Sequence, residues 1–177
     1  IEKGYNIVTA STLVSVSSVC GIVGTVFSGL ISDKMFRSNR TIPACLSSLL
    51  NLAALALFLF GPRQCEILDI ISMILFGISI GILLCFLGGL MAIDIAPKEA
   101  TGAAVGVIGI ASYAAAGLQD VVSGFLIESR KAIVDGNPVY DFSAIRIFWL
   151  SAALVSLLSL LIIWGARKKH VSSNIHY

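Results

Sequence analysis

Long apolar stretches without charged residues alternate with short charged clusters along this chain. The charge-free stretches cover residues 4–32, 41–62, 70–93, 100–119 and 147–166. Each is close to or longer than the ~20 residues that a helix needs to cross a hydrocarbon core of ~30 Å. Strands of a membrane barrel would instead give shorter segments of alternating polarity, which this sequence lacks. The pattern therefore predicts an all-α membrane protein with five spans. The predicted spans lie at about residues 7–32, 41–61, 69–93, 98–127 and 143–166.

Composition supports the membrane class and argues against several functions. Charged residues make up 12% of the chain and hydrophobic residues 57%, whereas about a quarter of the residues in a soluble domain are charged. The net charge of +2 is too small to indicate nucleic-acid binding. The four cysteines, Cys20, Cys45, Cys65 and Cys85, have no zinc or disulfide spacing. We expect no metal, no cofactor and no enzymatic activity.

Lysine and arginine favour one set of alternate loops, and such loops mark the cytoplasmic side of a membrane. The first set holds Lys34, Arg37, Arg40, Lys98, Arg167, Lys168 and Lys169. The second set holds Lys3, Arg63, Arg130, Lys131 and Arg146. We therefore expect cytoplasmic loops at 33–40 and 94–97, a cytoplasmic tail at 167–177 and an external loop at 128–142.

Glycine spacing predicts where helices touch. Gly77-xxx-Gly81 lies in the third predicted span and Gly102-xxx-Gly106 in the fourth. Lipid gives no hydrophobic drive for helix association, so close backbone approach at small residues supplies the contacts. Two interpretations remain open: ordinary bundle packing, or smooth faces along which helices slide during a transport cycle.

The external loop carries two local signals. The pair Asn137-Pro138 after Gly136 predicts a turn. Asp141 or Ser143 is expected to cap the fifth span, because both are good acceptors for free amides at a helix start.

The stretch GLISDKMFRSNR, residues 29–40, places Asp33, Lys34, Arg37 and Arg40 within eight positions. Its three basic residues alone would serve as a cytoplasmic anchor. An acid at the C-terminal end of a helix is disfavoured by the helix dipole, so Asp33 needs a partner. The candidates are Arg37 or Arg40 across the loop, or the N-terminal end of a neighbouring helix.

This stretch resembles the loop signature of the major facilitator superfamily, found between the second and third helices and again between the eighth and ninth. The form here resembles the organophosphate:phosphate antiporter branch. Its residues are Gly29, Ser32, Asp33, Lys34, Phe36, Arg37, Asn39 and Arg40.

Two further stretches resemble the same branch. Residues 91–128 are similar to its tenth-to-eleventh-helix region, and VYDFSAIRIFW, residues 139–149, looks more like the hexose-phosphate members. The matching positions in the first stretch are Asp94, Ala96, Pro97, Lys98, Ala100, Gly102, Ala104 and Gly106.

The resemblance implies that the five spans are helices eight to twelve of a twelve-helix carrier and form most of its C-terminal six-helix bundle. The N-terminal half and the seventh helix would then be partners outside this chain, and the start at Ile1 rather than Met suggests a fragment. Gly29, Asp33, Lys34, Arg37 and Arg40 would form part of a conformational latch against the opposite half. The cavity arginines that bind phosphate in the family would lie outside this chain.

The implied function is exchange of a sugar phosphate or related organophosphate for inorganic phosphate by alternating access, in the cell (inner) membrane. Two alternatives stay open: a sugar-phosphate sensor that keeps the carrier fold, and a non-functional truncated carrier.

Three polar residues are candidates for the substrate pathway. Tyr113 matches an eleventh-helix tyrosine that faces the cavity of glycerol-phosphate members, although Ile82 replaces their tenth-helix tyrosine. Asp120 is the one charge that lies away from the ends of a predicted span, and it shares a helical face with Tyr113. Each has an alternative: a helix-to-helix hydrogen bond for Tyr113, and a place among the lipid headgroups for Asp120. Gln119 is either a packing residue or a ligand for sugar hydroxyls.

Overall fold

The computed structural model describes residues 3–35, 40–63, 65–134 and 137–173. The α-helices are α1 (Ile7–Met35), α2 (Thr41–Phe60), α3 (Glu66–Cys85), α4 (Met91–Ile95), α5 (Thr101–Ser129) and α6 (Ser143–Ser173). A π-helical turn, η1 (Phe86–Leu90), joins α3 to α4, and a 3-10 turn, η2 (Lys98–Ala100), precedes α5. Strands β1 (Lys131–Val134) and β2 (Asn137–Tyr140) lie between α5 and α6.

Among the described residues, five helical segments are long and apolar enough to cross a membrane, which confirms the predicted all-α membrane class. These segments are Ile7–Leu30, Thr41–Phe60, Glu66–Ile95, Lys98–Ser129 and Ser143–Gly165. Two helices are longer than the sequence pattern indicated. Residues 33–35 belong to α1 rather than to a loop, and α6 continues to Ser173 into the predicted tail.

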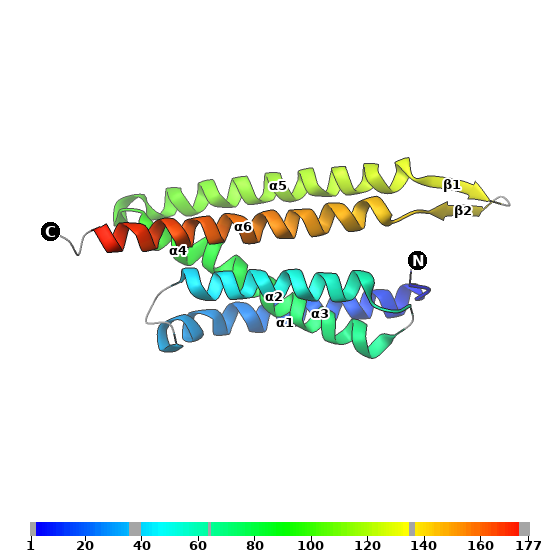
Figure 1. Ribbon diagram of the computed structural model, residues 1–177, viewed down its shortest axis with the longest axis horizontal. Coiled ribbons are helices and arrows are strands. Elements are labelled where there is room, and N and C mark those ends of the chain that lie inside the picture. Colours follow the sequence, from blue (N-terminus) through cyan, green and yellow to red (C-terminus); the bar gives the residue numbers. More distant parts are fainter. Residues whose placement is uncertain (1–2, 36–39, 64, 135–136, 174–177) are drawn as a thin grey trace.

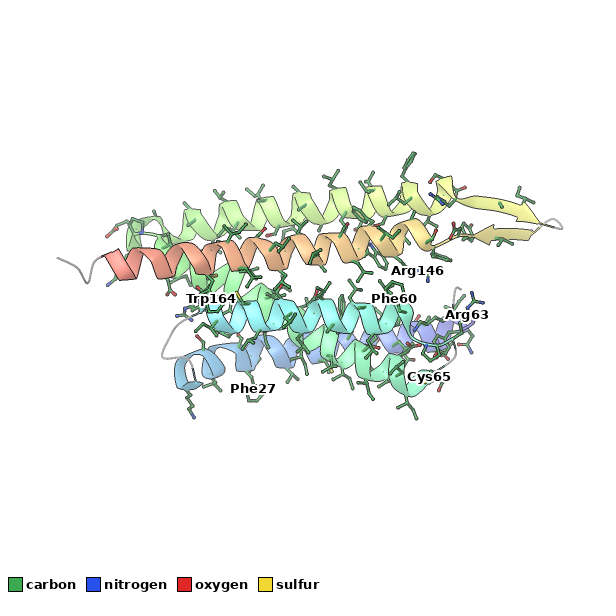
Figure 2. All side chains as sticks on the ribbon, viewed as in Figure 1. Phe27, Phe60, Arg63, Cys65, Arg146 and Trp164 are labelled. Atoms are coloured by element: carbon green, nitrogen blue, oxygen red, sulfur yellow. The ribbon has the colours of Figure 1, made fainter. Side chains whose placement is uncertain are left out.

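The helices form two groups that lie one above the other (Figure 1). Helices α5 and α6 run side by side in one group, while α1, α2 and α3 make up the other, and α2 packs against α6. The strands project at one end of the molecule, here named the hairpin end, and α6 finishes at the opposite tail end. Arg63 and Cys65 lie at the hairpin end, whereas Trp164 lies toward the tail end (Figure 2). The two predicted sets of loops therefore lie at opposite ends.

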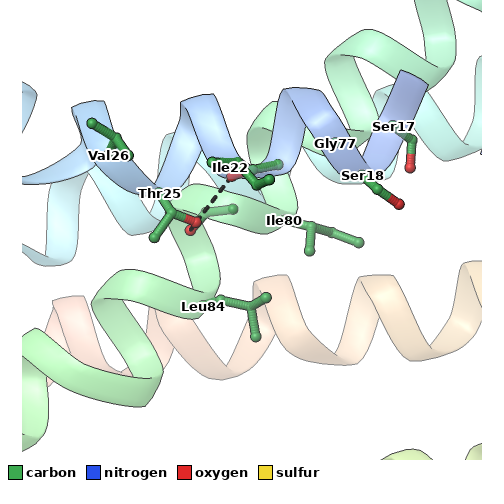
Figure 3. Close-up of a pocket in the computed structure, with 10 residues that line it drawn as sticks. Ser17, Ser18, Ile22, Thr25, Val26, Gly77, Ile80 and Leu84 are labelled. Carbon is green, nitrogen blue, oxygen red and sulfur yellow. Dashed lines mark hydrogen bonds between the residues drawn. The ribbon is translucent and has the colours of Figure 1, made fainter. Parts of the chain in front are cut away.

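Helices α1 and α3 approach each other so closely that backbone touches backbone. A Cβ on Gly77 would collide with the carbonyl oxygen of Ser17, and one on Gly81 with that of Gly21. Thr25 lies on this seam between the two helices and its Oγ1 donates to the carbonyl of Gly81 at 3.1 Å (Figure 3). The predicted contact at the Gly77-xxx-Gly81 pair is confirmed, because only glycine fits there.

The second glycine pair behaves differently. A Cβ on Gly102 or Gly106 would meet no described atom within 4 Å. Helix α5 also has just one buried residue among those described, Ser123. The predicted helix contact at Gly102-xxx-Gly106 is therefore wrong within the described part of this chain, because no described helix lies against that face.

A buried carboxylate fastens the start of the chain to α3. Asp69 is fully buried in the first turn of α3, with its Oδ1 paired to the ammonium of Lys3 and its Oδ2 accepting from the Tyr5 hydroxyl at 2.9 Å. Gly4 between these donors has φ of 76°, a conformation that favours glycine. The Lys3 Nζ also lies 4.4 Å from the ring centroid of Phe58, at the end of α2. We name Lys3, Tyr5 and Asp69 the Asp69 clamp.

The clamp was not anticipated, because the sequence pattern placed Lys3 in a loop and Asp69 at the start of a predicted span and gave no sign that the two are in contact. Partial burial, together with the hydrogen bond to Asp69, raises the pKa of Tyr5 to about 12. The phenol therefore remains a neutral donor at physiological pH. One acid with two donors thus ties α3 to the segment before α1.

The region predicted as an external loop forms an antiparallel β-hairpin instead. Val134 pairs with Asn137, which leaves Asp135 and Gly136 between the strands. The prediction of a turn at Asn137-Pro138 is wrong, because both residues belong to β2. Asp-Gly between two apolar runs is a stronger hairpin signal in a sequence than Asn-Pro.

Asp141 links the hairpin to α6. Its carboxylate accepts from the Ser143 amide at 2.9 Å and from the Ser143 hydroxyl at 2.8 Å. These bonds, with Arg130 nearby, hold the pKa of Asp141 below its usual range. The expected cap at this helix start is thus confirmed for Asp141.

The seam between α1 and α3 predicts opposite effects for two alanine substitutions. Gly81→Ala forces a methyl group into the α1 backbone and should lower the free energy of unfolding by about 1–3 kcal/mol. Gly106→Ala has open space and a better helix former, so stability should be unchanged or up to about 1 kcal/mol higher. Equilibrium unfolding in detergent measures both, and equal effects would contradict the seam.

The Asp69 clamp predicts a second difference. Asp69→Asn leaves the Lys3 ammonium without its counter-charge and should destabilise the chain by about 2–3 kcal/mol, somewhat less than for a wholly buried pair because Lys3 reaches solvent. Adding Lys3→Met should recover part of that loss. Glu66→Gln, an exposed acid in the same turn, is the matched control and should change stability by less than about 0.5 kcal/mol. A loss no larger than that of the control would refute the clamp.

Candidate functional site

An ion pair at the tail end joins two helices that the sequence keeps far apart. Arg40, immediately before α2, donates from Nε to Asp94 Oδ2 at 2.5 Å and from Nη2 to Asp94 Oδ1 at 3.4 Å. Asp94 lies in α4, the short helix at the end of the third span. A cation at the start of a helix is disfavoured by the dipole, and the carboxylate of Asp94 offsets that effect for Arg40. We name this pair the tail-end catch.

The catch changes the interpretation of the charged stretch at residues 29–40. Arg40 was a candidate partner for Asp33, but its guanidinium binds Asp94. Lys34 is exposed, and a Cβ on Gly29 would meet nothing within 4 Å. The side chain of Asp33 and the whole of Arg37 lie outside the described part of the chain. The structure thus places one of the five predicted latch residues in a specific contact, and it adds Asp94.

Tyr113 and Asp120 lie together on one face of α5. They are seven residues apart, which is close to two helical turns, and both side chains are exposed, Tyr113 by 84%. No described residue pairs with Asp120. The shared face predicted from the sequence is present, and the helix–helix hydrogen bond considered for Tyr113 has no described partner.

The length of the fourth span indicates how deep these residues lie. Its 32 residues, Lys98–Ser129, extend over about 48 Å, about 18 Å more than the hydrocarbon core. A centred helix places Tyr113, about 24 Å from Ser129, near the midplane of the bilayer. The same helix places Asp120, about 14 Å from Ser129, about 5 Å inside the hydrocarbon boundary.

Gln119 faces a different space from Tyr113 and Asp120. It is turned by about 100° from Asp120 on the helix, and it lines a cavity of about 560 Å³ between the two helix groups. The other polar lining residues are Ser17, Asn51 and Trp149. The three predicted pathway residues therefore divide into an outward face and an inner cavity.

The cavity wall is held by hydrogen bonds between helices. The indole Nε1 of Trp149 in α6 donates to the Ser123 Oγ of α5 at 3.1 Å. Asn51 in α2 donates from Nδ2 to the Ser79 Oγ of α3 at 3.3 Å. Trp149 and Asn51 thus already have partners on neighbouring helices, whereas the amide of Gln119 has no hydrogen bond to another described residue. A packing role and a ligand role both remain consistent with this position.

The polar face of α5 has a defined chemistry. A carboxylate accepts hydrogen bonds from hydroxyl groups, and a phenol donates or accepts them. The carboxylate repels an anion, and the phenol is neutral and offers a single donor. In the described spans, the basic residues Lys98 and Arg146 lie within the first turns and none lies deeper. Any cation that contacts a phosphate group at the midplane must therefore come from elsewhere.

Comparison with known proteins identifies relatives of this chain. The family model of the Major Facilitator Superfamily matches residues 1–119. The glycerol-3-phosphate transporter of Bacillus subtilis is 29% identical over 85% of this chain, and the membrane sensor protein UhpC of Escherichia coli is 32% identical over 65%. The probable galactarate/D-glucarate transporter GudP of Escherichia coli is 25% identical over 94%.

These relatives are much longer than the chain. The matches cover 32%, 26% and 35% of their respective lengths, so the chain spans about a third of each relative. The family model nevertheless covers more than half of the chain, and the five apolar helices agree with a multi-pass membrane protein. The chain belongs to the major facilitator superfamily.

Proposed function

We propose that the chain forms part of a secondary transporter that exchanges an organophosphate, such as a sugar phosphate, for inorganic phosphate by alternating access. The relatives include a glycerol-3-phosphate transporter, and the chain has the resemblance to the organophosphate branch described above. A probable galactarate/D-glucarate transporter among them supports transport in general. Its role is transport and binding rather than catalysis.

The observation that carries this proposal is the uncovered face of Tyr113 and Asp120. A charged side chain costs about 2.5–3.5 kcal/mol at the centre of a membrane helix on insertion scales, and Asp120, about 5 Å inside the hydrocarbon boundary, would incur part of that cost. No described residue pairs with Asp120, so its face is poorly suited to lipid. We place it against a water-filled pathway, with Tyr113 at the depth where alternating-access carriers bind substrate. This supports a transport role over a purely structural one.

The chemistry of that face assigns a part of the substrate to it. A carboxylate repels a phosphate group but accepts hydrogen bonds from sugar hydroxyls. We therefore assign the hydroxyl-bearing portion of the organophosphate to Asp120 and Tyr113. The phosphate group belongs to cations in the rest of the protein, namely the N-terminal half and the seventh helix that the resemblance implies.

A sugar-phosphate sensor is the second candidate, and the similarity to UhpC favours it. A sensor would use the same face to bind its ligand but would not move it across the membrane. A truncated remnant, the third candidate, would neither bind nor transport.

The arrangement of basic residues supports a cytoplasmic tail end in the cell (inner) membrane. Met35 at the end of α1, Arg40 before α2, the 94–97 connection and the last turns of α6 lie at the tail end, on the side with more basic residues, and the β-hairpin lies at the other end. Cys65 lies at the hairpin end and tests this orientation. A membrane-impermeant maleimide applied to intact cells should label the wild type but not Cys65→Ser. Labelling that requires lysis would reverse the orientation.

The transport proposal predicts exchange by the complete protein. The chain, expressed with the rest of its protein and reconstituted in phosphate-loaded proteoliposomes, should take up labelled hexose 6-phosphate or glycerol 3-phosphate only when internal phosphate is present. Ligand binding without uptake would favour the sensor. A chain that neither assembles nor binds would favour the remnant.

In the same assay, Asp120→Asn tests whether the hydroxyl-bearing part of the substrate and its phosphate group are bound by different residues. The KM for the organophosphate should rise about tenfold or more, the effect of losing a hydrogen bond to a charged group. Phosphate–phosphate exchange should be unchanged, because that substrate has no sugar hydroxyls. The control is Val121→Ala, an exposed neighbour on another face of α5, which should leave both exchanges unchanged. Equal loss of both exchanges by Asp120→Asn would indicate a structural role.

A further inference from the structure

The third membrane helix is interrupted by the π-helical turn η1, whose sequence is FLGGL. The Met91 amide donates to the carbonyl of Phe86, five residues earlier, where an α-helix bonds four residues earlier. Single π-helical turns within helices occur often at functional positions and are among the few recognised causes of helix kinks. This turn separates α3 from the short helix α4.

The two glycines of this turn are not required for packing. A Cβ on Gly88 or Gly89 would meet nothing within 4 Å, in contrast to Gly77 and Gly81 in the same membrane helix. Glycine in a helix interior is less favourable than alanine by about fivefold in equilibrium constant. A glycine pair that no neighbour demands therefore weakens the helix at one place, and bending is easiest there.

The residues on the two sides of the glycine pair are held differently. On one side, Phe86 is fully buried against Ala44 and Cys45 of α2 and Leu160 of α6. This packing fixes the end of α3 to the centre of the bundle.

On the other side of the glycine pair, Ile93 and Ile95 of α4 are 50% and 75% exposed. Among the described residues, the side chains of α4 bond to a distant segment through the Arg40–Asp94 catch. The packing of Phe86 thus fixes the chain just before the glycines. After them, α4 is held by the Arg40–Asp94 ion pair, which can break.

Movement of α4 would be passed on to α5. The chain runs from α4 through Pro97 and η2 directly into α5, the helix with Tyr113 and Asp120 and with Ser123 as its single described buried residue. Figure 1 shows that α4 connects the group of α1, α2 and α3 to the group of α5 and α6.

We propose that Gly88 and Gly89 form a hinge about which α4 and the adjoining end of α5 move relative to α3, and that the Arg40–Asp94 pair is the catch that holds one position. The proposal concerns motion of this chain and does not depend on the identity of the substrate. It also gives the glycine pair and the catch a joint role, because the catch has a function only if α4 can leave it.

Distances between pairs of spin labels test the hinge in the full chain reconstituted in nanodiscs, with the native cysteines replaced by alanine. The test pair is Phe60→Cys with Ile93→Cys, which spans the hinge. The control pair is Phe60→Cys with Leu84→Cys, which stops just before it. All three positions are at least half exposed, at 68%, 50% and 64%. The test pair should give a clearly broader distance distribution than the control pair.

Three variants then separate hinge from catch. Asp94→Asn should broaden or shift the test distribution, because the catch is weakened. The double change Gly88→Ala and Gly89→Ala should narrow it to the control width, since the two alanines favour a regular helix by roughly twentyfold. Gly102→Ala with Gly106→Ala, also in open space, is the matched control and should have no effect on either pair.

The result that overturns the proposal is equally specific. A test distribution as narrow as the control, unchanged in Asp94→Asn, would show that α4 is rigid. A broad distribution that the Gly88 and Gly89 changes leave unaltered would place the bend elsewhere and would reject the glycine hinge.

Discussion

The exclusion of unpaired charge from the hydrocarbon core is the constraint on which the rest of this structure depends. It produces the five apolar helices, because each backbone amide and carbonyl must be bonded within its own segment. It also requires that the acids near the helix ends be paired with cations or hydrogen-bond donors. Asp69 is buried but receives an ammonium and a phenol, and Asp94 receives a guanidinium. Each pair ties together segments that are more than fifty residues apart in sequence.

The helix packing divides the molecule into a closely packed part and a loosely packed part. In the absence of a hydrophobic drive in lipid, van der Waals contact must hold helices together, and Gly77 and Gly81 permit it between α1 and α3. The same glycine spacing on α5, at Gly102 and Gly106, has no described atom within 4 Å of the Cβ positions. The group of α1, α2 and α3 is therefore a compact unit, while α5 joins the structure chiefly through α6 and through α4.

The sequence was sufficient to predict features that depend on local composition. It could not predict features that depend on partners distant in the chain. Spans of uncharged residues identify membrane helices because the bilayer acts on each segment separately. The Arg40–Asp94 catch could not be chosen over an Arg40–Asp33 pair, because loop geometry decides which carboxylate lies within reach. Two identical glycine motifs likewise gave one contact and one open face. The π-helical turn at FLGGL and the β1–β2 hairpin did have local signals in the sequence, the glycine pair and the Asp-Gly dipeptide, although neither feature was predicted.

Comparison of three acids in the membrane helices shows where the molecule is incomplete in itself. Asp69 and Asp94 are both paired within the described chain, whereas Asp120, the acid farthest from a helix end, has no described partner. The cost of burying a charge applies to all three, so the face of Asp120 must meet water or protein that these helices do not supply. Gln119, turned toward the inner cavity, is exempt from that requirement because an amide is neutral. The pairing pattern within the described chain thus singles out Asp120 as the acid without a described partner, which supports the substrate pathway proposed for the Tyr113–Asp120 face.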